Sequence, residues 1–328
     1  MNLLAMVHGF PPMHNAGAEW MLFDLFKKLT EKGHKCKVMI PITGLKDYNY
    51  QGIEVVGDND VEVVKKEIAW CDIIISHLDR YGKALNRAEF FGKPYVLLVH
   101  NTHRYAGIAE KHKTEMRERW LYVVYNSEYT RDALRYPNPG IVVHPFVDAE
   151  RVRASKKEKV KYVTLINLWE GKGGKVLQQL AKEMPDVKFM GVKGGYGYQE
   201  IDENIKNIRY VENTPDISSI YAKTKILIMP SKYESFGRTA LEAMINGIPV
   251  IASPTEGLKE NLGEAGIFVN HEDIEGWKSA IRKLLDDKDY YEEMSKKCLE
   301  RADEFEKKYL KEIDELEIFL MNAINKKL

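Results

Sequence analysis

Short apolar runs alternate with helical stretches along the whole chain. Residues 2–8 (NLLAMVH) form a continuous apolar run, which is typical of a strand buried on both faces. A loop containing Gly, Pro and His follows, and apolar residues then recur at helical spacing from Ala18 to Leu29. Gly33 stands where a left-handed helix end is expected, just before the next apolar run, KCKVMI. The opening segment therefore predicts a strand, a helix and a second strand, as parallel α/β folds require.

The same alternation continues to about residue 270. In the first half, apolar runs predict further strands at 53–56, 71–76, 94–99, 121–125 and 141–143. In the second half, they predict strands near 161–166, 187–190, 208–211, 225–229, 248–252 and 266–269. The predicted fold class is therefore α/β, with two consecutive parallel sheets and about six or seven strands in the first.

The chain changes character at residues 144–160, where proline and mixed charge replace large apolar residues. Because domains mostly hold roughly 100–200 residues, a chain of 328 residues suits two. We expect an N-terminal domain over residues 1–150 and a C-terminal domain over 151–304. Apolar positions from Phe305 to Ile324 share one helical face, so residues 305–328 predict a terminal helix, with a return to the first domain as one option for its packing.

Composition and charge exclude several classes of protein. The chain is 44% hydrophobic and 30% charged, which argues against a disordered, collagenous or membrane-embedded protein. No run approaches the roughly 18 apolar residues of a membrane span. Forty-nine basic residues balance 49 acidic ones, which disfavours nucleic acid as a partner but leaves a local basic groove open. Residues 103–120 carry such a local excess and suit either a phosphorylated or membrane-surface acceptor or a solvated helix face.

The cysteines and the N-terminus bear on the compartment. Three widely spaced cysteines without a C-x-x-C pair argue against a disulfide framework and against a structural zinc site. No basic leader precedes the first apolar run, and two prolines follow it. We therefore expect a cytoplasmic protein, with peripheral contact at the inner membrane surface as an open alternative.

Residues 229–253 (MPSKYESFGRTALEAMINGIPVIAS) are the richest segment at a predicted strand end, which is where open parallel sheets bind ligands. Glu234 lies in the loop before a predicted helix, and Glu242 lies more than one turn inside that helix. Between them, the helix N-terminus would offer an anion the backbone amides of Phe236, Gly237, Arg238 and Thr239. The motifs G-x-x-x-x-G-K-[ST] and G-x-G-x-x-G are both missing, which disfavours a P-loop NTPase and a standard dehydrogenase.

An anion site flanked by two carboxylates suits a ligand that carries both phosphate and hydroxyl groups, because ionised carboxylates accept hydrogen bonds from vicinal hydroxyls. A nucleotide sugar is such a ligand. The alternative is that Glu234 stabilises the helix dipole and that Glu242 is a solvated helix residue.

This segment resembles the signature of two glutamates eight positions apart that marks family 4 glycosyltransferases. The similarity extends over nearly the whole chain and includes FPPMHNAGAEW and LTEKGHKCKVMI near the start, INLWEGKGGKVLQQL, and EGLKENLGEAGIFVNHEDIEGWKSAIRKLL. The resemblance implies a GT-B fold, in which two Rossmann-like domains face each other across a cleft and the C-terminal domain holds most of the donor nucleotide. It also implies retaining transfer without a metal or another cofactor.

The resemblance assigns roles to individual residues. It places Glu242 on the ribose hydroxyls, Glu234 near the donor sugar, and Lys172 on the diphosphate, where its charge would stabilise the leaving group. It places Gly17 where backbone amides approach the diphosphate and His100 near the reacting sugar, so His100, Glu234 and Lys172 are the expected catalytic residues. His8, His77 and His103 occupy loop positions similar to that of His100.

The chain departs from the family pattern at Asn167, where the family commonly has an arginine. One of two expected cationic contacts to the donor is therefore missing, although Asn167 keeps its place among the donor-binding residues. Arg238 is a candidate replacement, since the family more often has an aliphatic residue there; the alternative is a solvent-facing arginine.

The predicted function is retaining transfer of a hexose from a nucleoside diphosphate sugar to an acceptor hydroxyl. UDP-glucose or UDP-N-acetylhexosamine is the expected donor, and the sequence does not identify the acceptor. Two alternatives remain open: a nucleotide-sugar epimerase or hydrolase, and a catalytically silent protein that binds nucleotide sugars. A nucleic-acid acceptor is disfavoured by the balanced charge.

Overall fold

The computed structural model of the chain describes residues 1–41, 47–103, 121–154, 161–195 and 197–326. It divides into two compact units. The N-terminal unit consists of Met1–Phe146 with Lys308–Leu328, and the C-terminal unit consists of Val147–Lys307. The division thus falls near the predicted boundary at residue 150, and the last segment, expected to begin at 305, joins the first unit from Lys308 onward.

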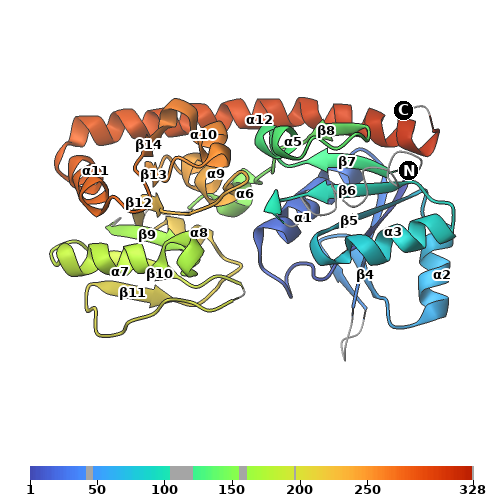
Figure 1. Cartoon of the computed structure of the whole chain (residues 1–328), viewed down its shortest axis with the longest axis horizontal. Coiled ribbons are helices and arrows are strands. Elements are labelled where there is room, and N and C mark those ends of the chain that lie inside the picture. The colour runs from blue at the N-terminus through green and yellow to red at the C-terminus, as the bar shows by residue number, and fades with distance from the viewer. Residues whose placement is uncertain (42–46, 104–120, 155–160, 196, 327–328) are drawn as a thin grey trace. The chain divides into compact units, whose positions relative to one another are not determined.

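The N-terminal unit is built on one sheet whose described strands follow the order β3-β4-β2-β1-β5-β6-β7-β8 (Figure 1). The strands are β1 (Asn2–Met6), β2 (Lys35–Ile40), β3 (Tyr48–Tyr50), β4 (Ile53–Gly57), β5 (Ile73–His77), β6 (Tyr95–Val99), β7 (Leu121–Tyr125) and β8 (Gly140–Val142). All neighbouring pairs are parallel except β3 with β4, which is antiparallel. Tyr48–Tyr50 is the strand that the apolar pattern misses, because a short edge strand with partly exposed tyrosines gives no continuous apolar run.

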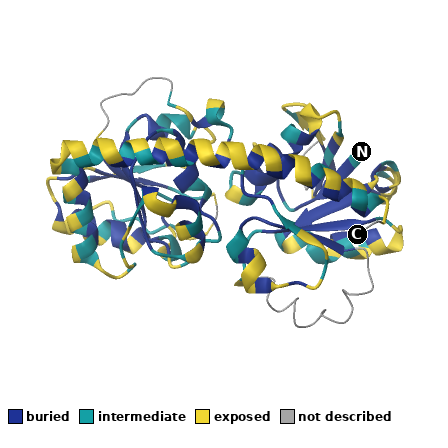
Figure 2. Ribbon diagram, turned by 90° about the horizontal axis from the view of Figure 1, so that it is seen from above, coloured by how far each residue is buried: buried dark blue, intermediate teal, exposed yellow. Residues whose placement is uncertain are grey.

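Successive residues of the central strands face opposite sides of the sheet and enter two different cores. Leu3 and Ala5 belong to one core, and Leu4 and Met6 to the other. The helices of this unit are α1 (Gly17–Glu31), α2 (Val61–Trp70), η1 (Leu78–Arg80), α3 (Tyr81–Phe90) and α5 (Glu128–Leu134). Burial on both faces explains why the strands are continuous apolar runs, and Figure 2 shows them as mainly buried.

The C-terminal unit holds a second sheet, ordered β11-β10-β9-β12-β13-β14, in which every described pair is parallel. Its strands are β9 (Tyr162–Ile166), β10 (Phe189–Val192), β11 (Ile208–Val211), β12 (Thr224–Met229), β13 (Val250–Ala252) and β14 (Gly266–Phe268). Its helices are α6 (Ala149–Val152), η3 (Glu170–Lys172), α7 (Gly174–Glu183), α8 (Ser218–Tyr221), α9 (Arg238–Ile245), α10 (Glu256–Leu262), η4 (Gly263–Ala265) and α11 (Ile274–Asp286). Each of these strands coincides with a strand predicted from the sequence.

The last helix, α12 (Lys288–Ile324), begins well before the predicted start at Phe305. Its earlier residues Cys298, Ala302 and Phe305 pack in a core of the C-terminal unit. Its later residues Tyr309, Ile313, Leu316, Phe319 and Leu320 pack in a core of the N-terminal unit. Glu312 fixes this second part, because its carboxylate accepts the backbone N–H of His144 at 2.8 Å and lies 2.7 Å from Nδ1 of the same residue. Among the described residues, no helix is both long enough and apolar enough to cross a membrane.

Candidate functional site

The candidate site of the C-terminal unit lies at the carboxyl ends of β9 and β12. These two strands are neighbours in the sheet, so the loops that follow them meet at one edge. The loop after β9 carries η3 and Lys172, and the loop after β12 carries Ser231 and Glu234 before α9 begins at Arg238. The chain thus brings together residues that lie some sixty positions apart in the sequence.

Backbone contacts tie the two loops together. The N–H of Lys232 donates to the carbonyl of Gly171 at 2.9 Å. Gly173 has a φ of +99°, and a Cβ at this position would lie 2.2 Å from Cγ of Pro230. Only glycine combines this left-handed backbone with so close an approach, so packing requires Gly173 in the EGKGG segment.

Lys172 and Glu234, two of the expected catalytic residues, form an ion pair. The Lys172 Nζ lies 2.6 Å from Glu234 Oε1, and the Ser231 hydroxyl donates to the same oxygen at 3.0 Å. The side chains of Lys172 and Glu234 are 25% and 12% exposed, so solvent and a ligand still reach the pair. The carboxylate is therefore oriented by two donors, and the ammonium remains partly exposed.

Glu242 is buried within α9 and is held by two side chains. Arg238 Nε lies 3.0 Å from its Oε1, and the Tyr221 hydroxyl donates to its Oε2 at 2.9 Å. Burial first, and then the charge of Glu242, raise the pKa of Tyr221 well above its ordinary value, which keeps this hydroxyl a donor. Glu242 is thus not the solvated helix residue of the alternative interpretation, and Arg238, whose side chain is 9% exposed, is not solvent-facing.

Asn261 fixes the backbone at the amino end of α9 through hydrogen bonds. Its Nδ2 donates to the carbonyls of Phe236 and Gly237 at 3.0 and 2.9 Å. Thr239 follows in the first turn of the helix. The expected donor-binding stretch Phe236–Thr239 therefore has a defined backbone, as an anion site at a helix N-terminus requires.

The segment after β13 begins with α10, whose first residues are Glu256, Gly257 and Leu258. Thr255 caps this helix through its hydroxyl, which accepts the N–H of Leu258 at 3.4 Å. Gly257 brings α10 against the loop that carries Glu234, since a Cβ there would lie 2.4 Å from the Glu234 carbonyl oxygen.

Asn167, the departure from the family pattern, has a local structural role. Its φ is +74°, a conformation that asparagine tolerates better than longer side chains. Its Oδ1 accepts the backbone N–H of Trp169 at 3.2 Å, and a Cβ on Gly194 would lie 2.5 Å from the same oxygen. The short side chain therefore stabilises its own loop.

Gly17 and His100, the remaining expected site residues, belong to the N-terminal unit. Gly17 starts α1, and a Cβ there would meet no atom within 4 Å among the described residues. His100 follows β6, and its Nε2 lies 2.9 Å from Nδ1 of His77 at the end of neighbouring β5. Burial lowers the pKa of His100 to about 4, so its imidazole is neutral at physiological pH.

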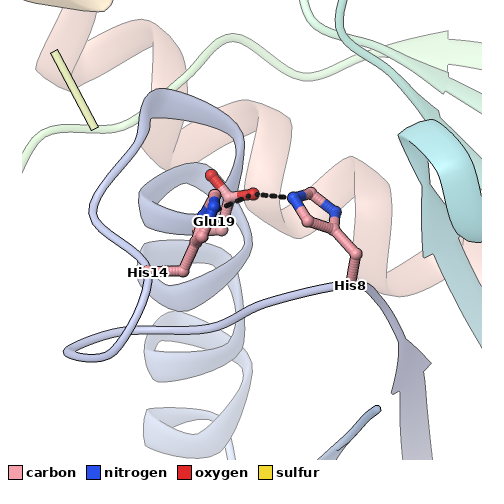
Figure 3. A group of neighbouring side chains, drawn as sticks. All are labelled: His8, His14 and Glu19. Carbon is pink, nitrogen blue, oxygen red and sulfur yellow. Dashed lines mark ion pairs between the residues drawn. The ribbon is translucent and has the colours of Figure 1, made fainter. Parts of the chain in front are cut away.

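A group of side chains around Glu19 escapes the sequence analysis (Figure 3). His8 follows β1, His14 lies in the next loop, and Glu19 lies in the first turn of α1. Burial alone would raise the pKa of Glu19, but hydrogen bonds from His14 and His8 hold it well below its ordinary value. The same bond to Glu19 raises the pKa of His14.

The available signal for this group was the close spacing of His8, His14 and Glu19 along the sequence, just after the first predicted strand. His103, the other residue with a similar loop position, is exposed. The basic stretch predicted over 103–120 falls, from residue 104 onward, outside the described residues.

Comparison with known proteins agrees with this architecture. Residues 196–302 match the family model described as "Glycosyl transferases group 1". A D-inositol 3-phosphate glycosyltransferase from Corynebacterium aurimucosum is 25% identical over 262 residues, which cover 63% of this chain and 62% of that protein. The matches cover from 20% to 62% of the length of these curated relatives.

Two solved structures cover almost the entire chain. Sucrose-phosphate synthase from Thermosynechococcus elongatus superposes with a TM-score of 0.81 at 15% identity, covering 98% of this chain and 100% of that one. Anabaena Alr3699/HepE, in complex with UDP and glucose, superposes with a TM-score of 0.78 at 17% identity and covers 96% of this chain and 99% of its own. The chain has a GT-B fold. The predicted fold class, α/β with two Rossmann-like parallel sheets, is thereby confirmed.

Proposed function

We propose that this GT-B chain is a retaining glycosyltransferase that moves a hexose from a nucleoside diphosphate sugar to an acceptor hydroxyl. The observation that carries the proposal is the pair of oriented carboxylates around the amino end of α9, with Lys172 bound to Glu234 and Tyr221 bound to Glu242. The match of residues 196–302 to a glycosyltransferase model supports it. The UDP and glucose of the Alr3699/HepE complex support UDP-glucose as the first donor to test, with UDP-N-acetylhexosamine as the second.

In this proposal, each donor-binding residue acts on a different part of the donor. Glu242 accepts hydrogen bonds from the ribose hydroxyls, in the orientation fixed by Tyr221 and Arg238. Glu234 accepts hydrogen bonds from the sugar. Lys172 contacts the diphosphate from its position beside Glu234.

The transfer step exchanges one bond for another at the anomeric carbon. The bond from this carbon to the phosphate oxygen breaks, and the acceptor oxygen attacks from the same face as the leaving group. The acceptor proton passes to an oxygen of the departing diphosphate. Lys172 and the amides at the start of α9 stabilise the negative charge that develops there, and the step needs no metal.

Two further assignments belong to the same proposal. Arg238 compensates for the arginine missing at Asn167, because it fixes Glu242 and adds positive charge beside the diphosphate site. His100 hydrogen-bonds a sugar hydroxyl as a neutral imidazole, consistent with its lowered pKa, and Gly17 lets backbone amides approach the diphosphate.

A phosphorylated polyol is the first acceptor class to test, because the Corynebacterium aurimucosum relative is named for such an acceptor. An epimerase or hydrolase would convert the donor without any acceptor. A silent binding protein would bind the donor and leave it intact.

Thermal stability in the presence of uridine and guanosine nucleotide sugars tests donor binding. A donor at 100 times its Kd stabilises the folded state by about 2.7 kcal/mol, or roughly 5–10 °C for a unit of this size. We expect one donor to raise the thermal midpoint of the parent selectively, and we expect Glu242→Gln and Lys172→Ala each to abolish this increase. Lys175→Ala is the matched control, since the Lys175 side chain is 60% exposed and pairs with Glu170 instead.

Release of nucleoside diphosphate with and without a phosphorylated polyol tests the reaction. Release that depends on the polyol supports a transferase, whereas release in water alone indicates a hydrolase. A donor-dependent thermal shift without turnover across acceptors would favour the silent binding protein, and no shift with any donor would refute the proposed function.

A further inference from the structure

The group around Glu19 has the composition and spacing of a metal site. Its possible ligand atoms are His8 Nε2, His14 Nδ1 and a Glu19 carboxylate oxygen, and all three lie within 4.8 Å of one another. Glu19 Oε1 is 3.1 Å from His8 Nε2 and 3.3 Å from His14 Nδ1. A tetrahedral zinc ion with bonds of about 2.0–2.1 Å separates its ligand atoms by about 3.3 Å. Both separations from Glu19 Oε1 are therefore already close to the spacing that such an ion imposes.

The local backbone holds these ligands in place without metal. The loop between β1 and α1 turns back on itself, with the N–H of His14 donating to the Phe10 carbonyl at 3.1 Å. His14 packs against Gly9, where a Cβ would lie 2.8 Å from the His14 Cβ. The Trp20 indole N–H donates to Asn15 Oδ1 at 2.6 Å and ties the end of the loop to α1. Ligands fixed in advance lose less conformational entropy when an ion binds.

Burial and charge favour a cation at this position. The Glu19 side chain is 2% exposed, and among the described residues its Oε2 has no hydrogen-bond donor. A buried carboxylate with one oxygen unpartnered is costly, and a cation bound beside it would compensate its charge. The side chains of His8 and His14 are 28% and 32% exposed, so an ion can reach the ligands from solvent. Figure 3 shows both imidazoles directed at the Glu19 carboxylate.

We propose that His8, His14 and Glu19 bind a divalent transition-metal ion of the zinc type. Two imidazoles and one carboxylate suit zinc better than magnesium or calcium, which prefer oxygen ligands. Three protein ligands leave one tetrahedral position for water or for an oxygen of a small molecule. The proposal concerns binding of the ion and does not depend on the proposed glycosyl transfer.

Zinc titration of the full chain, after treatment with a chelator, tests the proposal. A chromogenic competitor reports stoichiometry and Kd, and we expect one equivalent of Zn²⁺ per chain. Glu19→Gln and His14→Ala should each weaken binding by about 100-fold or more, because loss of even an indirect metal contact costs about 10–100-fold. His103→Ala, which removes an exposed histidine outside the group, should bind zinc as the parent does.

Cobalt provides a second measurement that does not rely on the variants. Co²⁺ bound by the parent chain should give the intense visible absorption of a four-coordinate site, and Zn²⁺ should displace it. Absence of stoichiometric Zn²⁺ binding by the parent would overturn the proposal. Equal Zn²⁺ affinity in the parent, His14→Ala and Glu19→Gln chains would also overturn it, whatever the outcome with nucleotide sugars.

Discussion

Replacement of Gly257 by alanine should disturb the site through the backbone alone. A Cβ at this position would lie 2.3 Å from the Ser235 carbonyl carbon and 2.4 Å from the Glu234 carbonyl oxygen. Both contacts are to backbone, so no side-chain rotation relieves them, and α10 and the Glu234 loop must separate by about 1 Å. Overpacking of this kind costs about 1–3 kcal/mol.

The same displacement predicts a loss of activity. Because misplacement of a reacting group by about 1 Å can lower turnover about 100-fold, Gly257→Ala should lose donor turnover by about that factor. Guanidinium unfolding followed by circular dichroism measures the stability, and hydrogen exchange of α10 and residues 231–237 locates the change. Gly82→Ala is the matched control, since a Cβ on Gly82 in α3 would meet no described atom within 4 Å.

Two outcomes would refute the reasoning about Gly257. One is a Gly257→Ala chain with the unfolding midpoint and local hydrogen exchange of the parent. The other is an equal loss of stability in Gly82→Ala, where alanine should instead stabilise the helix by about 0.5–1 kcal/mol.

Two further predictions concern stability. Asn207→Ala should lower the free energy of unfolding of the C-terminal unit by about 1–3 kcal/mol, because Asn207 Nδ2 lies within 3.0 Å of three carbonyls between residues 181 and 187. Denaturant unfolding measures the loss. Asn204 is exposed, so Asn204→Ala should have little effect, and equal losses in the two variants would contradict the role given to Asn207. His100 has a folded pKa of about 4 against an ordinary value of 6.5. The stability that the protein gains from keeping this imidazole neutral is therefore fully present above pH 6.5 and is lost as the pH falls toward 4. Thermal midpoints of the parent should therefore fall more between pH 7 and 5 than those of His100→Asn, and parallel curves would argue against a lowered pKa of His100.

The apolar pattern predicted most of the fold because both sheets are buried on two faces. Strands such as Tyr95–Val99 and Thr224–Met229 are continuous apolar runs for that reason, and their sequence alone marks them. Tyr48–Tyr50 and the first part of α12 were missed. The former is a partly exposed edge strand. The latter continues the same buried face, but its buried positions before Phe305 include small residues, Cys298 and Ala302, which give a weaker apolar signal.

The candidate site was predictable only where it follows a local pattern. Glu234 and Glu242 flank one helix start, and a short segment of sequence contains both. Tyr221 and Ser231 were not predictable as partners, since their contacts to these carboxylates depend on tertiary packing. The residues of the group around Glu19 lie within twelve positions of one another, but their convergence depends on how the loop between β1 and α1 folds back, which the sequence does not reveal.

The division of the N-terminal unit into two chain segments bears on how the protein matures during synthesis. Its core includes Tyr309, Ile313, Leu316, Phe319 and Leu320, while its other members come from the first 146 residues. At about 5–20 residues per second, a ribosome needs roughly 10–30 s to make the intervening segment. Throughout that interval the first segment lacks part of its core. The C-terminal unit is one continuous segment, residues 147–307, so all of its residues are synthesised before the N-terminal unit receives its last segment. The unit that leaves the ribosome first is therefore the last to acquire all of its residues.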